Sequence, residues 1–169
     1  MNGPGRLRQR RPEDLPGLVL ILRQVHEADG YPSAWPADPL SFVRATGVVE
    51  AWIAEAEGRP LGQVVLCEPG RGTLQTLVPG ALEIKRLFVG SEGRGSGLAA
   101  DLMARAHAGA QALERPAALQ VDPRNTAALA LYRKLGWQPV ATAEAPWLDP
   151  DGRAPMVEVL RAPAFLNPT

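Results

Sequence analysis

Residues 81–112 limit what this chain can fold into more than any other stretch of its sequence. They read ALEIKRLFVGSEGRGSGLAADLMARAHAGAQA. Ala81–Val89 ends in an apolar run and predicts a strand, and Gly90–Arg94 is typical of a turn. Apolar residues then recur at helical spacing: Leu98, Leu102, Met103 and Ala106. The stretch therefore predicts a strand, a glycine-rich turn and a helix, in that order.

A glycine-rich turn directly before a helix is suited to holding a phosphate group. At Gly95 and Gly97 no Cβ keeps a ligand away from the backbone. The N–H groups in the first turn of the helix have no intrahelical partners, and they lie at the positive end of the helix dipole. Together these features predict a seat for a phosphate or diphosphate on the backbone amides of Gly95, Ser96, Gly97, Leu98, Ala99 and Ala100.

Two blocks of the sequence resemble the GNAT superfamily of N-acetyltransferases. In the first, Leu87-Phe88-Val89 precedes Arg94-Gly95-Ser96-Gly97-Leu98-Ala99, and Arg94, Gly97 and Ala99 fill the fixed places of the acetyl-CoA-binding signature Gln/Arg-x-x-Gly-x-Gly/Ala. The second block, residues 119–137, has Tyr132 seven positions after Asn125 and then Leu135-Gly136-Trp137. Both blocks occur in the family's order and together cover about half of the chain.

The order of elements predicts a single α/β (α+β) domain spanning residues 1–169, with a three-layer GNAT-like fold. We expect a mixed, mostly antiparallel sheet of about seven strands flanked by about four helices. The predicted strands are Arg6–Arg11, Glu50–Ala56, Leu61–Cys67, Ala81–Val89, Pro116–Val121, Trp137–Ala143 and Pro155–Leu160. The predicted helices run from Pro12 to about Glu27, from Asp38 to about Ala45, after Arg94, and from Asn125 to Leu135. Glu68–Gly80 is expected to be a flexible surface loop.

The resemblance implies direct transfer of an acetyl group from acetyl-CoA to a bound amine, with no metal. Backbone groups of Leu87, Phe88 and Val89 would meet the pantetheine arm of the cofactor as an added strand does. Arg94 would contact a phosphate, or would be a solvated loop arginine. Asn125 would contact the cofactor, cap its helix, or do both.

Tyr132 matches the family's general acid, which protonates the leaving thiolate. The alternative is a core tyrosine with a satisfied hydroxyl group. For the general base the best candidate is Glu83, although it could instead form a surface ion pair with Lys85 or Arg86. Some relatives have a glutamate where this chain has Gln120, which cannot accept a proton. Asp122 and His26 are therefore reserve candidates for the base.

The acceptor is not identified by the sequence beyond a small-molecule amine or a peptide N-terminus. In the family, the connection between the first two helices helps to wall the acceptor site. Tyr31 and Trp35, together with His26, lie in the predicted loop His26–Pro39 and are candidates for contacting the acceptor. The alternative is that these side chains anchor the loop by packing on the core.

Composition excludes several classes of partner. The chain has 18 basic and 18 acidic side chains, so no basic excess favours nucleic acid. No apolar stretch is long enough for a membrane span or a signal peptide. The single cysteine, Cys67, excludes an internal disulfide, is best interpreted as a small buried side chain, and fits a reducing compartment. We therefore expect a cytoplasmic protein.

Two other functions compete with this interpretation. Gly95–Ala100 also satisfies the dinucleotide pattern Gly-x-Gly-x-x-Ala, with Asp122 about twenty residues further on. Glu83, Lys85 and Arg86 make the preceding strand too polar for the centre of a parallel sheet, so this alternative fails. A non-catalytic acyl-CoA-binding sensor or structural module of the same fold stays open. A homodimer formed through the C-terminal strands is common in relatives and is neither supported nor excluded by the sequence.

Overall fold

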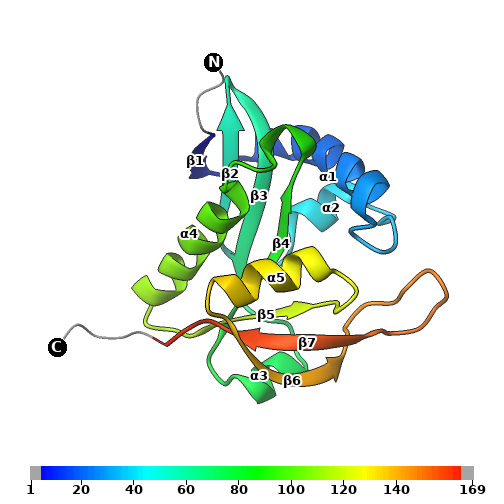
Figure 1. The fold of residues 1–169 in the computed structure, drawn as a ribbon, viewed down its shortest axis with the longest axis vertical. Coiled ribbons are helices and arrows are strands. Elements are labelled where there is room, and N and C mark those ends of the chain that lie inside the picture. The colour runs from blue at the N-terminus through cyan, green and yellow to red at the C-terminus, as the bar shows by residue number, and fades with distance from the viewer. Residues whose placement is uncertain (1–4, 165–169) are drawn as a thin grey trace.

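A computed structural model of the chain describes residues 5–164. The strands are β1 (Arg6–Gln9), β2 (Val48–Ala56), β3 (Arg59–Cys67), β4 (Leu82–Val89), β5 (Ala117–Val121), β6 (Gln138–Glu144) and β7 (Met156–Arg161). The α-helices are α1 (Leu15–Asp29), α2 (Pro39–Arg44), α3 (Thr73–Leu77), α4 (Leu98–Ala112) and α5 (Thr126–Lys134). Two short 3₁₀ turns, η1 (Pro12–Asp14) and η2 (Ser91–Gly93), precede α1 and α4 (Figure 1).

The seven strands form one open sheet in the order β1-β2-β3-β4-β5-β7-β6. The pair β4–β5 is parallel, and the other neighbouring pairs are antiparallel. The crossover that parallel neighbours require is the turn and helix that follow β4. The prediction of a mixed, mostly antiparallel GNAT-like sheet is confirmed.

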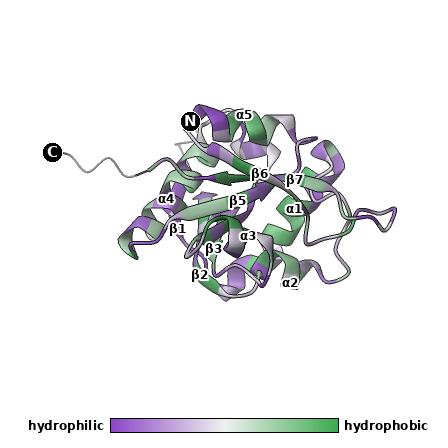
Figure 2. Cartoon of the chain, turned by 90° about the horizontal axis from the view of Figure 1, so that it is seen from below, coloured by the Kyte–Doolittle hydropathy of each residue, from purple (hydrophilic) through white to green (hydrophobic). Residues whose placement is uncertain are grey.

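Helices cover both faces of the sheet and create a three-layer arrangement. One core cluster joins the apolar sides of α4 and α5 to the sheet through residues such as Leu102, Leu129 and Leu160. On the opposite face, α1 and α2 pack on Ile53 and Phe88, and α3 forms a smaller cluster with β5 and β7. In Figure 2, helices such as α4 and α5 carry both hydrophobic (green) and hydrophilic (purple) residues, as expected of helices with one face on the sheet.

The sheet parts between β4 and β5. The two strands are paired only at Leu82–Ala117 and Glu83–Ala118, although β4 continues to Val89 and β5 to Val121. Beyond Glu83, the edge of β4 that faces β5 therefore has no ladder partner, while its other edge stays bonded to β3. An unpaired strand edge inside a sheet is a template for an extended ligand.

Strand β4 also contains a bulge. Its register with β3 runs from Val65–Lys85 to Gln63–Phe88, so Arg86 and Leu87 together face Val64. Arg86 has φ 57°, in the left-handed region that non-glycine residues rarely adopt. Bulges of this kind turn a side chain toward a new direction.

Most predicted elements are present with ends shifted by one to three residues. Two predictions are wrong. The segment predicted as a surface loop, Glu68–Gly80, contains α3, whose Leu74 is buried against the sheet. His26 lies inside α1, which ends at Asp29 with Gly30 in the left-handed conformation, and not in the loop that follows.

Among residues 5–164, no helix combines the length and the apolar character that crossing a membrane demands.

Candidate active site

The turn between β4 and α4 presents a row of backbone amides. The first backbone hydrogen bond of α4 is donated by Asp101 to the carbonyl of Gly97, and no amide from Gly95 to Ala100 has a backbone acceptor in the described chain. Gly95 and Gly97 have φ 75° and 80°, and a Cβ placed on either residue would meet no atom within 4 Å. The cradle is therefore open, and it can bind an anion through peptide nitrogens.

Arg94 directly precedes this amide cradle, and its side chain contacts another part of the protein. Its guanidinium forms an ion pair with Asp29 at the end of α1. Both side chains are more than two-fifths exposed, so the pair is weakly held in water. Arg94 is therefore not a purely solvated loop arginine, as one prediction had it. Its guanidinium is paired with Asp29 and not directed into the cradle.

Asn125 is the N-cap of α5. Its side-chain oxygen accepts a hydrogen bond of 3.1 Å from the amide of Ala128. Capping stabilises the helix that carries Tyr132 two turns further on. The helix ends at Lys134 with Leu135 as its C-cap, one residue before the predicted end, and Gly136 has φ 87°.

Tyr132 is buried, yet its hydroxyl group is not sealed off. The ring packs in the α4–α5 core cluster with a centroid distance of 6.3 Å to Trp137. No buried side-chain nitrogen or oxygen among residues 5–164 lacks a hydrogen-bond partner, and the Tyr132 hydroxyl makes no hydrogen bond there. The hydroxyl therefore reaches solvent. Burial raises the pKa of Tyr132, so the phenol keeps its proton at neutral pH.

The segment between α1 and α2 divides its aromatic side chains between two environments. Trp35 packs against α1, where its ring lies 5.4 Å from that of His26 and 4.8 Å from the guanidinium carbon of Arg23. His26 contacts the carbonyl of Pro32 through Nδ1 at 2.6 Å. Tyr31 instead packs on Phe42 of α2 and is an electrostatic neighbour of Tyr132. Of the three candidates for acceptor contact, Tyr31 is the one within electrostatic range of Tyr132.

Glu83 is buried beside the point where β4 and β5 part. Its Oε2 accepts a hydrogen bond of 3.2 Å from Nε2 of Gln120 on β5. The predicted alternative, an ion pair with Lys85 or Arg86, is not formed among the described residues. A buried carboxylate held on one oxygen can take a proton on the other.

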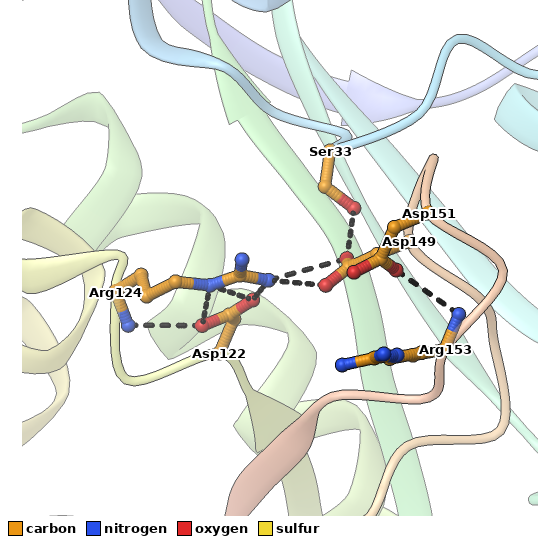
Figure 3. Close-up of polar contacts among 6 residues, drawn as sticks. All are labelled: Ser33, Asp122, Arg124, Asp149, Asp151 and Arg153. Atoms are coloured by element: carbon orange, nitrogen blue, oxygen red, sulfur yellow. Dashed lines mark hydrogen bonds and ion pairs between the residues drawn. The ribbon is translucent and has the colours of Figure 1, made fainter.

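An arginine bridge joins the loops at the carboxyl end of β5. Arg124 contacts both carboxylate oxygens of Asp122 and of Asp149, and Ser33 donates to Asp149 at 3.0 Å (Figure 3). Asp149 belongs to the β6–β7 loop and Ser33 to the α1–α2 loop, so three segments meet at this point. The Arg124 guanidinium lowers the pKa of Asp122, which disfavours Asp122 as a base. Sequence reasoning missed this bridge, because its members are distant in the chain.

A separate surface hollow lies near the β1 edge of the sheet. It is lined by the end of β1, the first residues of η1 and α1, the end of α2 and the start of β2, and it includes Arg10, Arg11 and Arg44. Arg10 is already held by the carbonyls of Val43 and Arg44. The hollow shares no residue with the β4–α4 turn.

Solved structures share this fold. A putative acetyltransferase (yncA) from Salmonella typhimurium, solved with its cofactor acetyl-CoA, has a TM-score of 0.72 at 15% identity, covering 99% of this chain and 98% of that chain. The ribosomal-protein-S18-alanine N-acetyltransferase from Escherichia coli has a TM-score of 0.69 at 17% identity, covering 98% and 99%. Arabidopsis thaliana NAA60, solved with a bisubstrate analogue, has a TM-score of 0.71 at 20% identity, covering 93% and 96%.

No curated protein matches the sequence at a significant level. A family model described as an acetyltransferase (GNAT) domain matches residues 48–139, which is more than half of the chain. The matched region extends from the first residue of β2 into β6 and contains the parted strands, the amide cradle and Tyr132. This chain therefore belongs to the GNAT acetyltransferase family.

Proposed function

We propose that this protein is a single-domain N-acetyltransferase that transfers the acetyl group of acetyl-CoA directly to the primary amine of a small molecule or a peptide N-terminus. One observation carries the proposal. Strand β4 loses its partner β5 after Glu83, and the freed edge leads within one turn to the open amide cradle at the start of α4. An extended arm ending in a diphosphate fits this sequence of features.

The cofactor would be held mainly by backbone groups. The amides of Gly95–Ala100 would bind the diphosphate, and the free edge of Leu87–Val89 would pair with the pantetheine arm. Asn125 would add a contact through its amide nitrogen, because its oxygen is used in capping α5. Arg94 would have to leave Asp29 to reach a phosphate. The bound thioester supplies an already activated acetyl group.

Tyr132 is proposed as the general acid. Its hydroxyl is open to solvent at the end of a fixed ring, and its raised pKa keeps it protonated when a thiolate leaves. A thiolate is a good proton acceptor, so the phenol needs only to lie near the sulfur. Tyr31, the neighbour of Tyr132, would line the acceptor side, whereas Trp35 would support the loop.

Glu83 is proposed as the general base that removes a proton from the acceptor ammonium, directly or through water. Gln120 fixes one carboxylate oxygen by its hydrogen bond and leaves the other available. Asp122 is tied to Arg124, and His26 contacts the Pro32 carbonyl, so both reserve candidates are engaged elsewhere.

The proposal extends to the cytoplasm as the compartment, since one buried free thiol, Cys67, fits a reducing environment.

Release of free coenzyme A tests the proposal against a non-catalytic sensor of the same fold. The protein is mixed with acetyl-CoA and a panel of primary amines, and the new thiol is measured with a disulfide reagent. Cys67 is buried and burial raises the pKa of its thiol to about 11, so the protein itself reacts slowly. An acetyltransferase releases coenzyme A in the presence of some amine. A sensor binds acetyl-CoA but releases none above the amine-free rate.

A further inference from the structure

We propose that Arg86 binds an anionic group, a carboxylate or similar oxyanion, that the acceptor carries next to its reactive amine. The acceptor would then be an amino-acid-like compound and not the N-terminus of a peptide, whose first carboxylate has become an amide. This inference rests on the proposed function, because it assigns the acceptor class of the same site.

The guanidinium of Arg86 is half-buried and has no acidic partner among the described residues. Nε donates to the carbonyl of Phe42 at 3.0 Å, and the guanidinium carbon lies 3.7 Å above the Phe42 ring. No ion pair within residues 5–164 includes Arg86. A guanidinium without an acidic partner keeps its capacity to pair with an anionic ligand.

The two terminal nitrogens of Arg86 remain available to a ligand. The Tyr31 hydroxyl is near enough to interact with the guanidinium, but no hydrogen bond of normal geometry joins them. Every fully buried side-chain nitrogen within residues 5–164 has a hydrogen-bond partner. The two terminal nitrogens of Arg86 have none, so they are not fully buried. Nε is bonded to the Phe42 carbonyl and the guanidinium carbon lies over the Phe42 ring, so two contacts hold the group from which the remaining N–H groups project. A planar fork of this kind binds a carboxylate by two parallel hydrogen bonds.

The bulge in β4 is what brings the guanidinium to this place. Leu82 and Ile84 point into the core cluster under α4, and regular alternation would direct Arg86 into the same apolar cluster. The bulge, with Arg86 at φ 57°, turns the side chain to the opposite face, against α2. The strand thus adopts an irregular and strained conformation that delivers a cation beside the parted strands.

Two tyrosines connect Arg86 to the proposed reaction centre. Tyr31 and Arg86 both pack on Phe42, with 6.4 Å between the Tyr31 and Phe42 ring centroids and 3.7 Å between the Arg86 guanidinium carbon and the Phe42 centroid. Tyr31 also lies within electrostatic range of Tyr132 on α5. If the acceptor amine lies next to the thioester, near Tyr132, the carbon that carries this amine would point toward Arg86.

The phosphates of the cofactor are a poor alternative occupant. The amide cradle begins at Gly95, nine positions after Arg86 and beyond η2, whereas the Arg86 side chain turns to the α2 face. Glu83 and Lys85 lie on the same strand, but Glu83 is bonded to Gln120 and not to Arg86. The open fork is therefore assigned to the acceptor.

The test measures acetylation of the twenty standard amino acids, each compared with its C-terminal amide, by the wild type and by Arg86→Gln, Arg86→Lys and Arg115→Gln. Arg115 is the matched control, because its Nε also donates to a backbone carbonyl, that of Gly80 at 2.8 Å, but its fork is already bound to Glu68. Thermal unfolding of each variant verifies that it is folded.

We expect the wild type to prefer at least one free amino acid over its amide by roughly ten- to hundredfold in kcat/KM, the worth of a charged bidentate contact. Arg86→Gln should remove this preference by raising KM for the acid while leaving the amide within about twofold. Arg86→Lys should keep part of the preference, since it keeps the charge and loses the fork. Arg115→Gln should behave as the wild type.

Equal use of acids and amides by the wild type, or an equal loss for both in Arg86→Gln, would overturn the inference. If no amine is acetylated, the proposed function fails, and calorimetric titration of the same amino acids into the coenzyme A complex decides on Arg86 separately. If the wild type binds an amino acid and Arg86→Gln does not, the role of Arg86 as the carboxylate-binding residue is supported. Absence of binding, or binding that the variant retains, refutes it.

Discussion

Gln120 donates a hydrogen bond of 3.2 Å to Glu83 across the point where β4 and β5 stop pairing. Here the amide cannot take a proton, but it orients the buried carboxylate at the parting of the strands. The base and its support are thus divided between two strands, and each can be tested separately.

Glu83→Gln should lower kcat by roughly 10²- to 10⁴-fold, because a glutamine cannot accept the proton of the acceptor ammonium. The acid limb of the kcat/KM–pH profile should disappear with it. Glu50→Gln is the control, since Glu50 also accepts a side-chain hydrogen bond, from Trp52, but lies on β2. A Glu83→Gln enzyme with wild-type kcat would show that the base lies elsewhere.

Gln120→Glu should shift the acid limb of the same profile to higher pH. The new carboxylate would face Glu83 across a hydrogen-bond distance, and two like charges this close raise the pKa of one of them. The nearly isosteric change Gln120→Met should lower kcat without such a shift. Steady-state rates across neutral pH measure both effects, and identical profiles for all three proteins would contradict a role for this pair.

Tyr132→Phe should reduce kcat by roughly 10²- to 10⁴-fold with little change in affinity for coenzyme A. The ring stays in the core cluster with Trp137, so only the accessible hydroxyl is lost. Turnover assays and calorimetry with coenzyme A separate the two quantities. Unchanged turnover would remove the acid role, and a parallel loss of affinity would indicate a binding role.

The buried phenol of Tyr132 also predicts how stability depends on pH. Burial raises its pKa in the folded protein above the value of about 10 that it has when unfolded. Above about pH 10 the unfolded state therefore loses this proton first, and the free energy of unfolding falls as pH rises; below that pH the contribution is fully present. Denaturation on either side of about pH 10 should show a smaller fall for Tyr132→Phe than for the wild type.

Gly97→Ala should weaken binding of coenzyme A by roughly tenfold or more, because the added Cβ would occupy the open side of the amide cradle. Both Gly97 and Gly58 have positive φ, 80° and 75°, and a Cβ added to either would have no atom within 4 Å. Gly58→Ala, in the β2–β3 turn, is therefore the control for backbone strain of about 1–2 kcal/mol. Equal cofactor affinities of the two variants would argue against a ligand at Gly97.

Arg124→Gln should free the β6–β7 loop, because it removes the bridge between Asp122 and Asp149. Hydrogen exchange of residues 145–155 should accelerate, while that of the β4–β5 core stays unchanged. Arg153→Gln is the control within the same loop, since the backbone amide of Arg153 is the group that bonds to Asp151. Unaltered exchange in Arg124→Gln would show that the bridge does not hold the loop.

The fold was largely predictable because its signals are local. The strand, turn and helix from Ala81 to Ala112, and the Gly136 stop, depend on spacing and on glycine conformation within a few residues. Helix α3 was missed because it has only five residues and is surrounded by glycines, and it is stabilised by contacts of Leu74 with strands far away in sequence. Its existence is a tertiary effect.

The same division applies to the candidate site. The amide cradle and the capping role of Asn125 follow from short motifs, so sequence reasoning found them. Arg86 could not be recognised, since its left-handed conformation depends on the register with β3. Tyr31 and Tyr132 are far apart in the chain and come within electrostatic range only through the tertiary packing of the α1–α2 loop and α5, so local patterns could not predict their relation.

A crystal structure with coenzyme A tests the central claim most directly. The account predicts diphosphate oxygens within hydrogen-bonding distance of the peptide nitrogens between Gly95 and Ala100, with the sulfur next to the Tyr132 hydroxyl. A cofactor bound elsewhere, with those nitrogens vacant or the phenol turned away from the sulfur, would contradict it.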